Sequence, residues 1–224
     1  MINIYVCKYD EQYEDILLDK MSLLSYSDKE RIEKYRFSKD RIMSFMGLAM
    51  FYAFCDTKKK NGTVTVLKDY SFITKEIFEK NIVVEVEKNG KPEVKNNDSL
   101  FFNISHSGEY TVLAVSDKPV GIDVQEYKNI NKRIADRFFN KKDSEYLDKF
   151  EDDEYMKKTI EVWTAKEAYV KMLGKGIGEG LDGFYEDFEE GIIIDALKED
   201  IKAVICPVKF DEKYACFWCA EQYS

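Results

Sequence analysis

Only one histidine, His106, occurs in the 224 residues of the chain. An HExxH metalloprotease helix or a three-histidine zinc site needs more than one histidine, so a single chain cannot build either. The five cysteines are odd in number and scattered, so a complete disulfide framework cannot form and we expect reduced thiols. Carboxylate chemistry with a hard metal ion stays open.

Long apolar segments are also lacking. The longest, at 45–55, has about half of the ~20 residues that a membrane-spanning helix needs, so we expect a buried helix there. The first residues have neither the basic leader nor the apolar stretch of a secretory signal. The sequence therefore predicts a cytoplasmic protein without a membrane partner.

Positive charge is scarce as well. The chain has 34 Lys and Arg residues against 43 Asp and Glu residues, which gives a formal net charge of -9. Nonspecific binding of nucleic acid needs a basic face, so no nucleic-acid partner is expected. With 45% hydrophobic and 34% charged residues, the composition is typical of a globular protein rather than a disordered one.

The spacing of apolar residues predicts a mixture of strands and helices. Strands are expected at 2–6, 82–86, 101–104, 110–115, 120–125, 203–208 and 214–220. Helices are expected up to residue 36 after a cap at Ser27 or Asp28, and at 39–56, 132–139, 143–150 and 153–173. A tight turn is expected at 88–91, and the acidic stretch 186–190 is interpreted as a solvated loop. The break at 116–119 divides the predicted α+β protein into subdomains 1–118 and 119–224.

Two segments place carboxylates where chemistry is possible. In the strand at 120–125, Asp123 and Gln125 share one face, although a strand end that emerges into solvent would look the same. On the helix at 153–173, Glu167 shares a stripe with Trp163 and lies one turn before Lys171. A carboxylate beside a tryptophan is partly desolvated and needs a cation or a metal, but a plain Glu167–Lys171 ion pair is the simpler reading.

A third segment, FNISHSG at 102–108, is a strand that ends in hydroxyls, an imidazole and a glycine. Such a turn could bind phosphate. Alternatively, His106 could be a turn residue whose ring makes its hydrogen bonds within the turn and binds no ligand. A serine hydrolase is not supported, because no GxSxG motif is present and neighbouring Ser105 and His106 on a strand point apart.

Taken together, these segments resemble the Sfp-type 4'-phosphopantetheinyl transferases. Five motifs occur in the order and with the spacing of that family: FNISHSG at 102–108, GID at 121–123, RFF at 137–139, WTAKEAYVK at 163–171 and GKG at 174–176. It implies two pseudo-symmetric α+β subdomains with the active site in the cleft between them, in a monomer. It also implies Mg²⁺-dependent transfer of 4'-phosphopantetheine from coenzyme A to a serine of an apo acyl or peptidyl carrier protein, releasing adenosine 3',5'-bisphosphate.

The resemblance also assigns residues, each by its match to the family's motifs. The implied catalytic residues are Asp123, Glu167 and Lys171, and the implied Mg²⁺ ligands are Asp123, Gln125 and Glu167. The residues implied to bind coenzyme A are Arg41, Ser44, Gly90, Lys91, Pro92, Ser105, His106 and Lys171. Gln125 stands where the family usually has a second acidic ligand, so a coenzyme A- or carrier-binding homologue with weakened or lost activity is the alternative.

Overall fold

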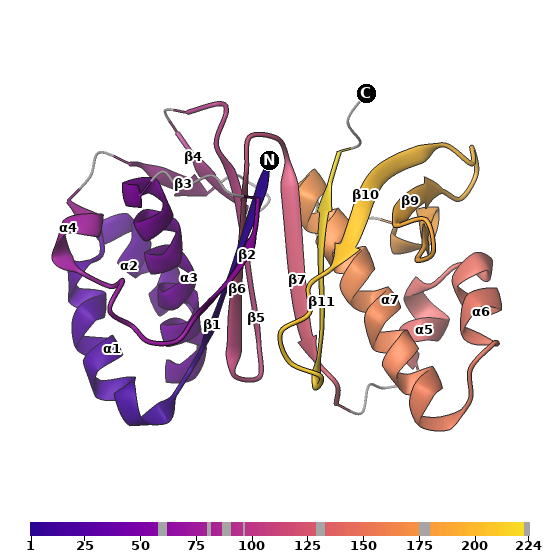
Figure 1. The fold of residues 1–224 in the computed structure, drawn as a ribbon, viewed down its shortest axis with the longest axis horizontal. Helices are drawn as coiled ribbons and strands as arrows, with labels where there is room; N and C mark the ends of the chain where they lie inside the picture. Colours follow the sequence, from indigo (N-terminus) through magenta and orange to yellow (C-terminus); the bar gives the residue numbers. More distant parts are fainter. Residues whose placement is uncertain are drawn as a thin grey trace.

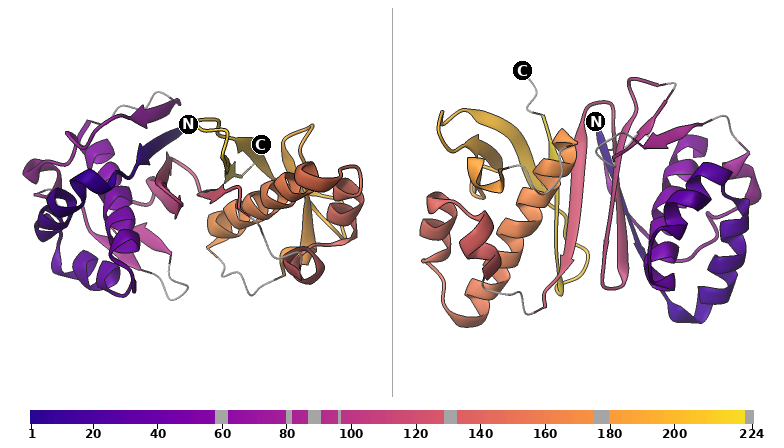
Figure 2. Two further views of the ribbon diagram at one scale, coloured as in Figure 1. Left: turned by 90° about the horizontal axis from the view of Figure 1, so that it is seen from below. Right: turned by 180° about the vertical axis from the view of Figure 1, so that it is seen from behind.

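Two sheets and the helices that cover them make up the fold. The computed structural model describes residues 1–57, 62–79, 82–86, 91–95, 97–128, 133–174 and 180–221. One sheet has the strand order β2-β1-β6-β5, the other has the order β7-β11-β10-β9-β8, and β3 and β4 form a small third sheet. Most strands of the first sheet, with β7 and β11 of the second, lie in the middle of the molecule, while the helices lie on both outer sides (Figures 1 and 2). This mixture confirms the predicted α+β class.

The first half of the chain contains the elements β1 (Ile2–Lys8), η1 (Glu11–Tyr13), α1 (Glu14–Lys20), η2 (Met21–Leu23), α2 (Tyr26–Glu33), α3 (Ser38–Thr57), β2 (Val64–Leu67), α4 (Lys75–Phe78), β3 (Val84–Val86), β4 (Pro92–Val94), β5 (Phe101–Ser107) and β6 (Tyr110–Ser116). The second half contains β7 (Val120–Glu126), α5 (Arg133–Phe138), α6 (Lys141–Leu147), α7 (Asp152–Leu173), η3 (Leu181–Gly183), β8 (Phe184–Asp187), β9 (Ile192–Asp195), β10 (Ile201–Pro207) and β11 (Tyr214–Ala220).

Helix α3 holds the first half together. Its apolar run is buried, as the sequence predicts, and packs on β5 and β6. Phe51 stacks on Phe102 of β5, with ring centroids 3.9 Å apart. A Cβ added at Gly47 would overlap the side chain of Ile104, so glycine permits a close approach of α3 to β5.

Helix α7 has the same role in the second half, where it crosses β7 and β11. A Cβ at Gly121 of β7 would overlap the carbonyl oxygen of Ala168 and lie 2.5 Å from the backbone nitrogen of Met172. The α7 backbone therefore touches the strand directly. The helix ends at Leu173 and is followed by the cap residue Gly174, whose φ of 69° is the left-handed conformation that glycine adopts without strain.

The two halves meet where β5 and β7 lie side by side. Asn103 Oδ1 accepts a hydrogen bond from the backbone of Ile122 at 2.9 Å, and Ser107 Oγ accepts one from the backbone of Glu126 at 3.1 Å. A buried apolar cluster also joins the halves, because it contains residues of β1, β6, β7 and β11. The division at 118/119 stays a prediction.

Several details differ from the sequence predictions. The cap of α2 is Ser25, whose side chain accepts from the backbone of Asp28. Strand β5 continues to Ser107, so Ser105 and His106 lie in a strand rather than in a turn. Glu186 of the acidic stretch is buried in β8, which contradicts a solvated loop there. Gly90 and most of the turn predicted at 88–91 fall outside the described residues.

No helix among the described residues is long and apolar enough to cross a membrane.

Candidate functional site

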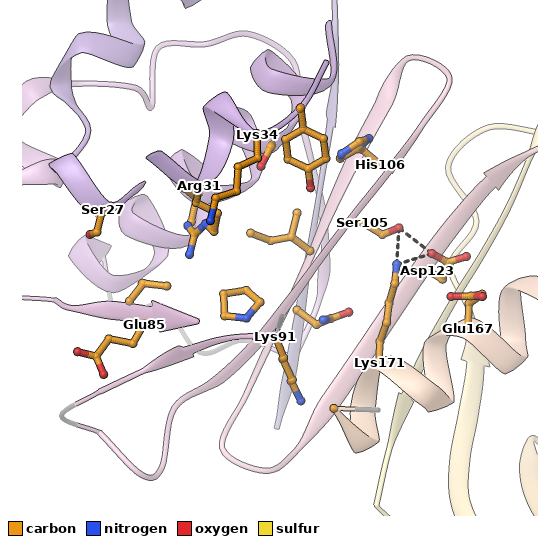
Figure 3. A pocket seen from close by; sticks show the side chains of 18 of the residues that line it. Ser27, Arg31, Lys34, Glu85, Lys91, Ser105, His106, Asp123, Glu167 and Lys171 are labelled. Atoms are coloured by element: carbon orange, nitrogen blue, oxygen red, sulfur yellow. Dashed lines mark hydrogen bonds and ion pairs between the residues drawn. The ribbon is translucent and has the colours of Figure 1, made fainter. Parts of the chain in front are cut away.

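A cleft of about 1170 Å³ lies between the two halves of the fold (Figure 3). Its walls come from α2, α3, the β3–β4 sheet, β5, β7 and α7. The charged and imidazole side chains that line it are Glu30, Arg31, Lys34, Glu85, Lys91, His106, Asp123, Glu167 and Lys171. Both cations and carboxylates therefore line one continuous cavity.

Asp123 is the centre of a hydrogen-bonded group at the α7 end of the cleft. It is 1% exposed, and its Oδ1 accepts from Lys171 Nζ at 2.6 Å and from Ser105 Oγ at 2.7 Å. Lys171 Nζ also donates to Ser105 Oγ at 2.9 Å. Lys171 thus forms its ion pair with Asp123 across the helix–strand contact, and not along the helix with Glu167.

Glu167 faces the same group but lacks a hydrogen bond at one oxygen. The residue is 5% exposed, and its Oε1 is buried without a hydrogen-bond partner. Burial, and then the negative charge of Asp123, raise the pKa of Glu167 to about 7, although Lys171 works in the opposite direction. A carboxyl group of this kind can take a proton near neutral pH or receive a cation.

Gln125 lies on the same face of β7 as Asp123, as strand alternation predicts. Its Nε2 donates to Asp123 Oδ2 at 3.0 Å. Two carboxylates and an amide oxygen are donors that Mg²⁺ accepts, and the unpartnered Glu167 Oε1 fits a cation. Among the described residues, no cluster of three His, Cys, Asp or Glu side chains could hold a metal ion. At this site the third oxygen donor is the amide of Gln125.

His106 lines the cleft next to this group. Burial is the main cause that lowers its pKa, with a smaller contribution in the same direction from Lys171. The imidazole is therefore neutral at pH 7 and can donate one hydrogen bond. The ring of Tyr35 packs against it edge to face, with centroids 5.9 Å apart.

The other end of the cleft is built on α2. Ser27, Glu30, Arg31 and Lys34 line it at helical spacing, and Ser44 of α3 joins them. No site role was predicted for Ser27, Glu30 or Tyr35, although the i, i+3, i+4 spacing of Ser27, Glu30 and Arg31 on one helix was a usable signal.

The remaining predicted residues divide between the cleft and its surroundings. Pro92 and Lys91 line the cleft, and Lys91 Nζ donates to the carbonyl oxygen of Met172 at 3.0 Å. Arg41 is not among the lining residues, and its Nη1 donates to the carbonyl oxygen of Tyr35 at 3.4 Å. Of the predicted residues that the structure describes, all but Arg41 come together in one cavity.

Two family models and several curated sequences match this chain. A model described as "4'-phosphopantetheinyl transferase, N-terminal" matches residues 11–118, and one described as "4'-phosphopantetheinyl transferase superfamily" matches residues 119–223. The 4'-phosphopantetheinyl transferase psf-1 of Bacillus pumilus is 45% identical over 46% of this chain and 44% of its own length.

Two further relatives align over longer regions. The 4'-phosphopantetheinyl transferase gsp of Aneurinibacillus migulanus is 31% identical over 69% of this chain and 65% of its own length. The 4'-phosphopantetheinyl transferase ffp of Bacillus subtilis is 32% identical over 65% of this chain and 67% of its own length. The chain thus matches about half to two thirds of the length of these curated relatives. These matches and the cleft geometry agree, and the chain belongs to the 4'-phosphopantetheinyl transferase superfamily.

Proposed function

We propose that the chain transfers 4'-phosphopantetheine from coenzyme A to a serine hydroxyl of an apo acyl or peptidyl carrier protein. The observation that carries the proposal is the buried Glu167, with an unpartnered oxygen, beside the Asp123–Lys171–Ser105 group in a nucleotide-sized cleft. The serine oxygen bonds to the phosphorus that bears pantetheine, and the bond from that phosphorus to the bridging oxygen breaks. Adenosine 3',5'-bisphosphate leaves with that oxygen.

Glu167 and Lys171 have complementary roles in this proposal. Glu167 takes the proton of the serine hydroxyl, directly or through water, and its raised pKa suits a base that works near neutral pH. Lys171 lies on the same helix one turn later and neutralises charge on the pyrophosphate as the leaving group forms. Its present partners, Asp123 and Ser105, hold its ammonium group at the floor of the cleft.

Mg²⁺ is part of the proposal, with Asp123, Gln125 and Glu167 as its protein ligands. When bound, the ion would neutralise negative charge on the pyrophosphate. Mg²⁺ can be coordinated by carboxylate oxygens and phosphate oxygens at the same time. Asp123 keeps its orientation through Ser105, and Gln125 would present its carbonyl oxygen after its amide group has turned from Asp123.

Coenzyme A would lie along the cleft with its pyrophosphate near α7. Ser105, His106 and Lys91 line the cleft and would contact its phosphates. Pro92 would border the adenine, while Arg31, Lys34 and Ser44 would hold the 3'-phosphate at the α2 end. The roles of Arg41 and Gly90 stay predictions, as do the monomeric state and the cytoplasmic location.

Incubation with coenzyme A, Mg²⁺ and an apo carrier protein tests the function directly. Mass spectrometry of the carrier should show the added phosphopantetheine on one serine, and omission of Mg²⁺ should abolish it. If the protein binds coenzyme A or the carrier but leaves the carrier unmodified, the result would instead support a binding homologue that has lost transferase activity.

A further inference from the structure

Arg31 is held from behind by a buried aspartate that the proposed function does not use. Asp28 lies on the same helix and is 2% exposed. Its Oδ1 accepts a hydrogen bond from Arg31 Nη2 at 2.9 Å. Its Oδ2 accepts from Ser25 Oγ and from the hydroxyl of Tyr52, each at 2.8 Å. Both carboxylate oxygens are therefore fixed.

The donors behind Asp28 are themselves held in place. Ser25 is the cap of α2 and accepts from the backbone of Asp28 at 3.2 Å. Tyr52 belongs to α3, and burial together with the Asp28 carboxylate raises its pKa, so its hydroxyl keeps the proton that it donates. Asp28 thus ties α2 to α3 and presents a fixed oxygen to Arg31, whose side chain is 19% exposed at the cleft wall.

The side chains that line this end of the cleft carry no net positive charge. Glu30 and Glu85 line it together with Arg31 and Lys34, so cations and carboxylates balance. An anion would then be recognised by directed N–H groups rather than by overall potential. A guanidinium with one nitrogen bound to a carboxylate presents its other N–H groups in a fixed plane, which suits the geometry of a phosphate.

We propose that Asp28 is a positioning residue that orients Arg31 toward a phosphate monoester on the ribose of a nucleotide bound in the cleft. The inference rests on the proposed function, in which this group is the 3'-phosphate of coenzyme A. Asp28 would then set the preference for nucleotides that carry this phosphate over those that lack it.

Calorimetric titrations with adenosine 3',5'-bisphosphate and with adenosine 5'-phosphate test the proposal without a carrier protein. The wild-type protein should prefer the bisphosphate, and Asp28→Asn should reduce that preference at least about tenfold, because a charge-assisted orientation is lost. The affinity for the monophosphate should not change in this variant, whereas general damage to the fold would lower the affinity for both nucleotides. Asp19→Asn on α1 removes the same charge from an exposed site and is the matched control.

An Asp28→Asn protein with the wild-type preference would overturn the role of Asp28. If circular dichroism shows that Asp28→Asn does not fold, the same titrations are made with Arg31→Lys, which keeps the positive charge but loses the planar guanidinium group. A retained preference in Arg31→Lys overturns the proposal, and a lost preference supports it. A wild-type protein that binds neither nucleotide would contradict the proposed function as well.

Discussion

At the residue scale, Glu167 combines burial with an oxygen that no hydrogen-bond donor reaches. We predict that Glu167→Gln lowers turnover at least about 100-fold, because a general base commonly contributes a factor of about 10² to 10⁴. The fold should persist, since glutamine has the same shape and removes a buried charge. Turnover comes from the carrier-modification assay, and circular dichroism reports the fold.

The matched control is Glu154→Gln in the exposed first turn of the same helix, which should keep full activity. Near-normal turnover by Glu167→Gln would remove the assignment of Glu167 as the base.

Gln125 is the residue at which this chain departs from the resemblance. Without a third carboxylate, and with Lys171 already paired to Asp123, the free protein should bind Mg²⁺ weakly. We predict that Gln125→Glu tightens Mg²⁺ binding to the free protein at least about tenfold, because it adds a charge next to the ion. When coenzyme A is bound, the two proteins should differ less in Mg²⁺ affinity, since its phosphates supply oxygen ligands to the ion in both.

Calorimetric titrations of Mg²⁺ into both proteins, with and without coenzyme A, measure this effect. Tight Mg²⁺ binding by the unmodified protein alone would show that two carboxylates already suffice.

Much of the site's chemistry was predictable from spacing within single elements. Strand alternation places Asp123 and Gln125 on one face, and helical spacing places Glu167 one turn before Lys171. The partner of Lys171 was not predictable in this way, because its pair with Asp123 depends on how closely α7 approaches β7. The same limit applies to Asp28, whose contact with Tyr52 joins two helices.

At the element scale, the approach of α7 to β7 depends on Gly121. We predict that Gly121→Ala destabilises the protein by about 3 kcal/mol or more, because the added methyl group meets backbone atoms of Ala168 and Met172 that cannot move aside alone. Activity should fall too, since a displaced α7 carries Glu167 and Lys171 away from Asp123.

Urea denaturation gives the free energy of unfolding of this variant. Gly183→Ala is the matched control, because nothing lies within 4 Å of a Cβ at that position. Equal stability of the two variants would contradict the close helix–strand contact.

A second feature of α7 is Lys166, which is fully buried opposite two carboxylates. Its Nζ lies 2.9 Å from Asp143 Oδ2 and 3.8 Å from Glu186 Oε2, and it donates to the carbonyl oxygens of Leu181 and Phe184. One cation cannot balance two buried anions. Burial first, and Asp143 as a further cause, raise the pKa of Glu186, so Glu186 holds a proton in the folded protein at neutral pH.

This proton makes stability depend on pH. Because the folded-state pKa of Glu186 lies above its unfolded value of about 4.3, its contribution is complete below that value and is lost as the pH rises through the folded pKa. We predict that the free energy of unfolding falls from about pH 6 to about pH 9 and that Glu186→Gln reduces this slope. Urea denaturation at both pH values checks this prediction, and an equal slope in the variant would show that Glu186 does not hold this proton.

Glu186 also shows why part of the second half was mispredicted. The acidic letters at 186–190 indicate solvent exposure, but the partner that permits burial, Lys166, lies twenty residues earlier on another element. Strands β8 and β9 are short and their neighbours are set by the sheet, so local periodicity does not reveal them. The long helices α3 and α7 were predictable because their patterns extend over several turns.

At the scale of the whole molecule, the apolar cluster shared by β1, β6, β7 and β11 couples the two halves. Asn103 and Ser107 add hydrogen bonds across the β5–β7 junction. We predict that both halves unfold in one transition, because separation would expose this cluster and leave the backbone nitrogens of Ile122 and Glu126 without these partners. The only two tryptophans, Trp163 and Trp218, belong to elements of the second half, so their fluorescence mainly reports that half. Amide hydrogen exchange of α3 reports the first, and its midpoint in urea should coincide with the fluorescence midpoint; loss of protection in α3 at lower urea would show that the halves unfold separately.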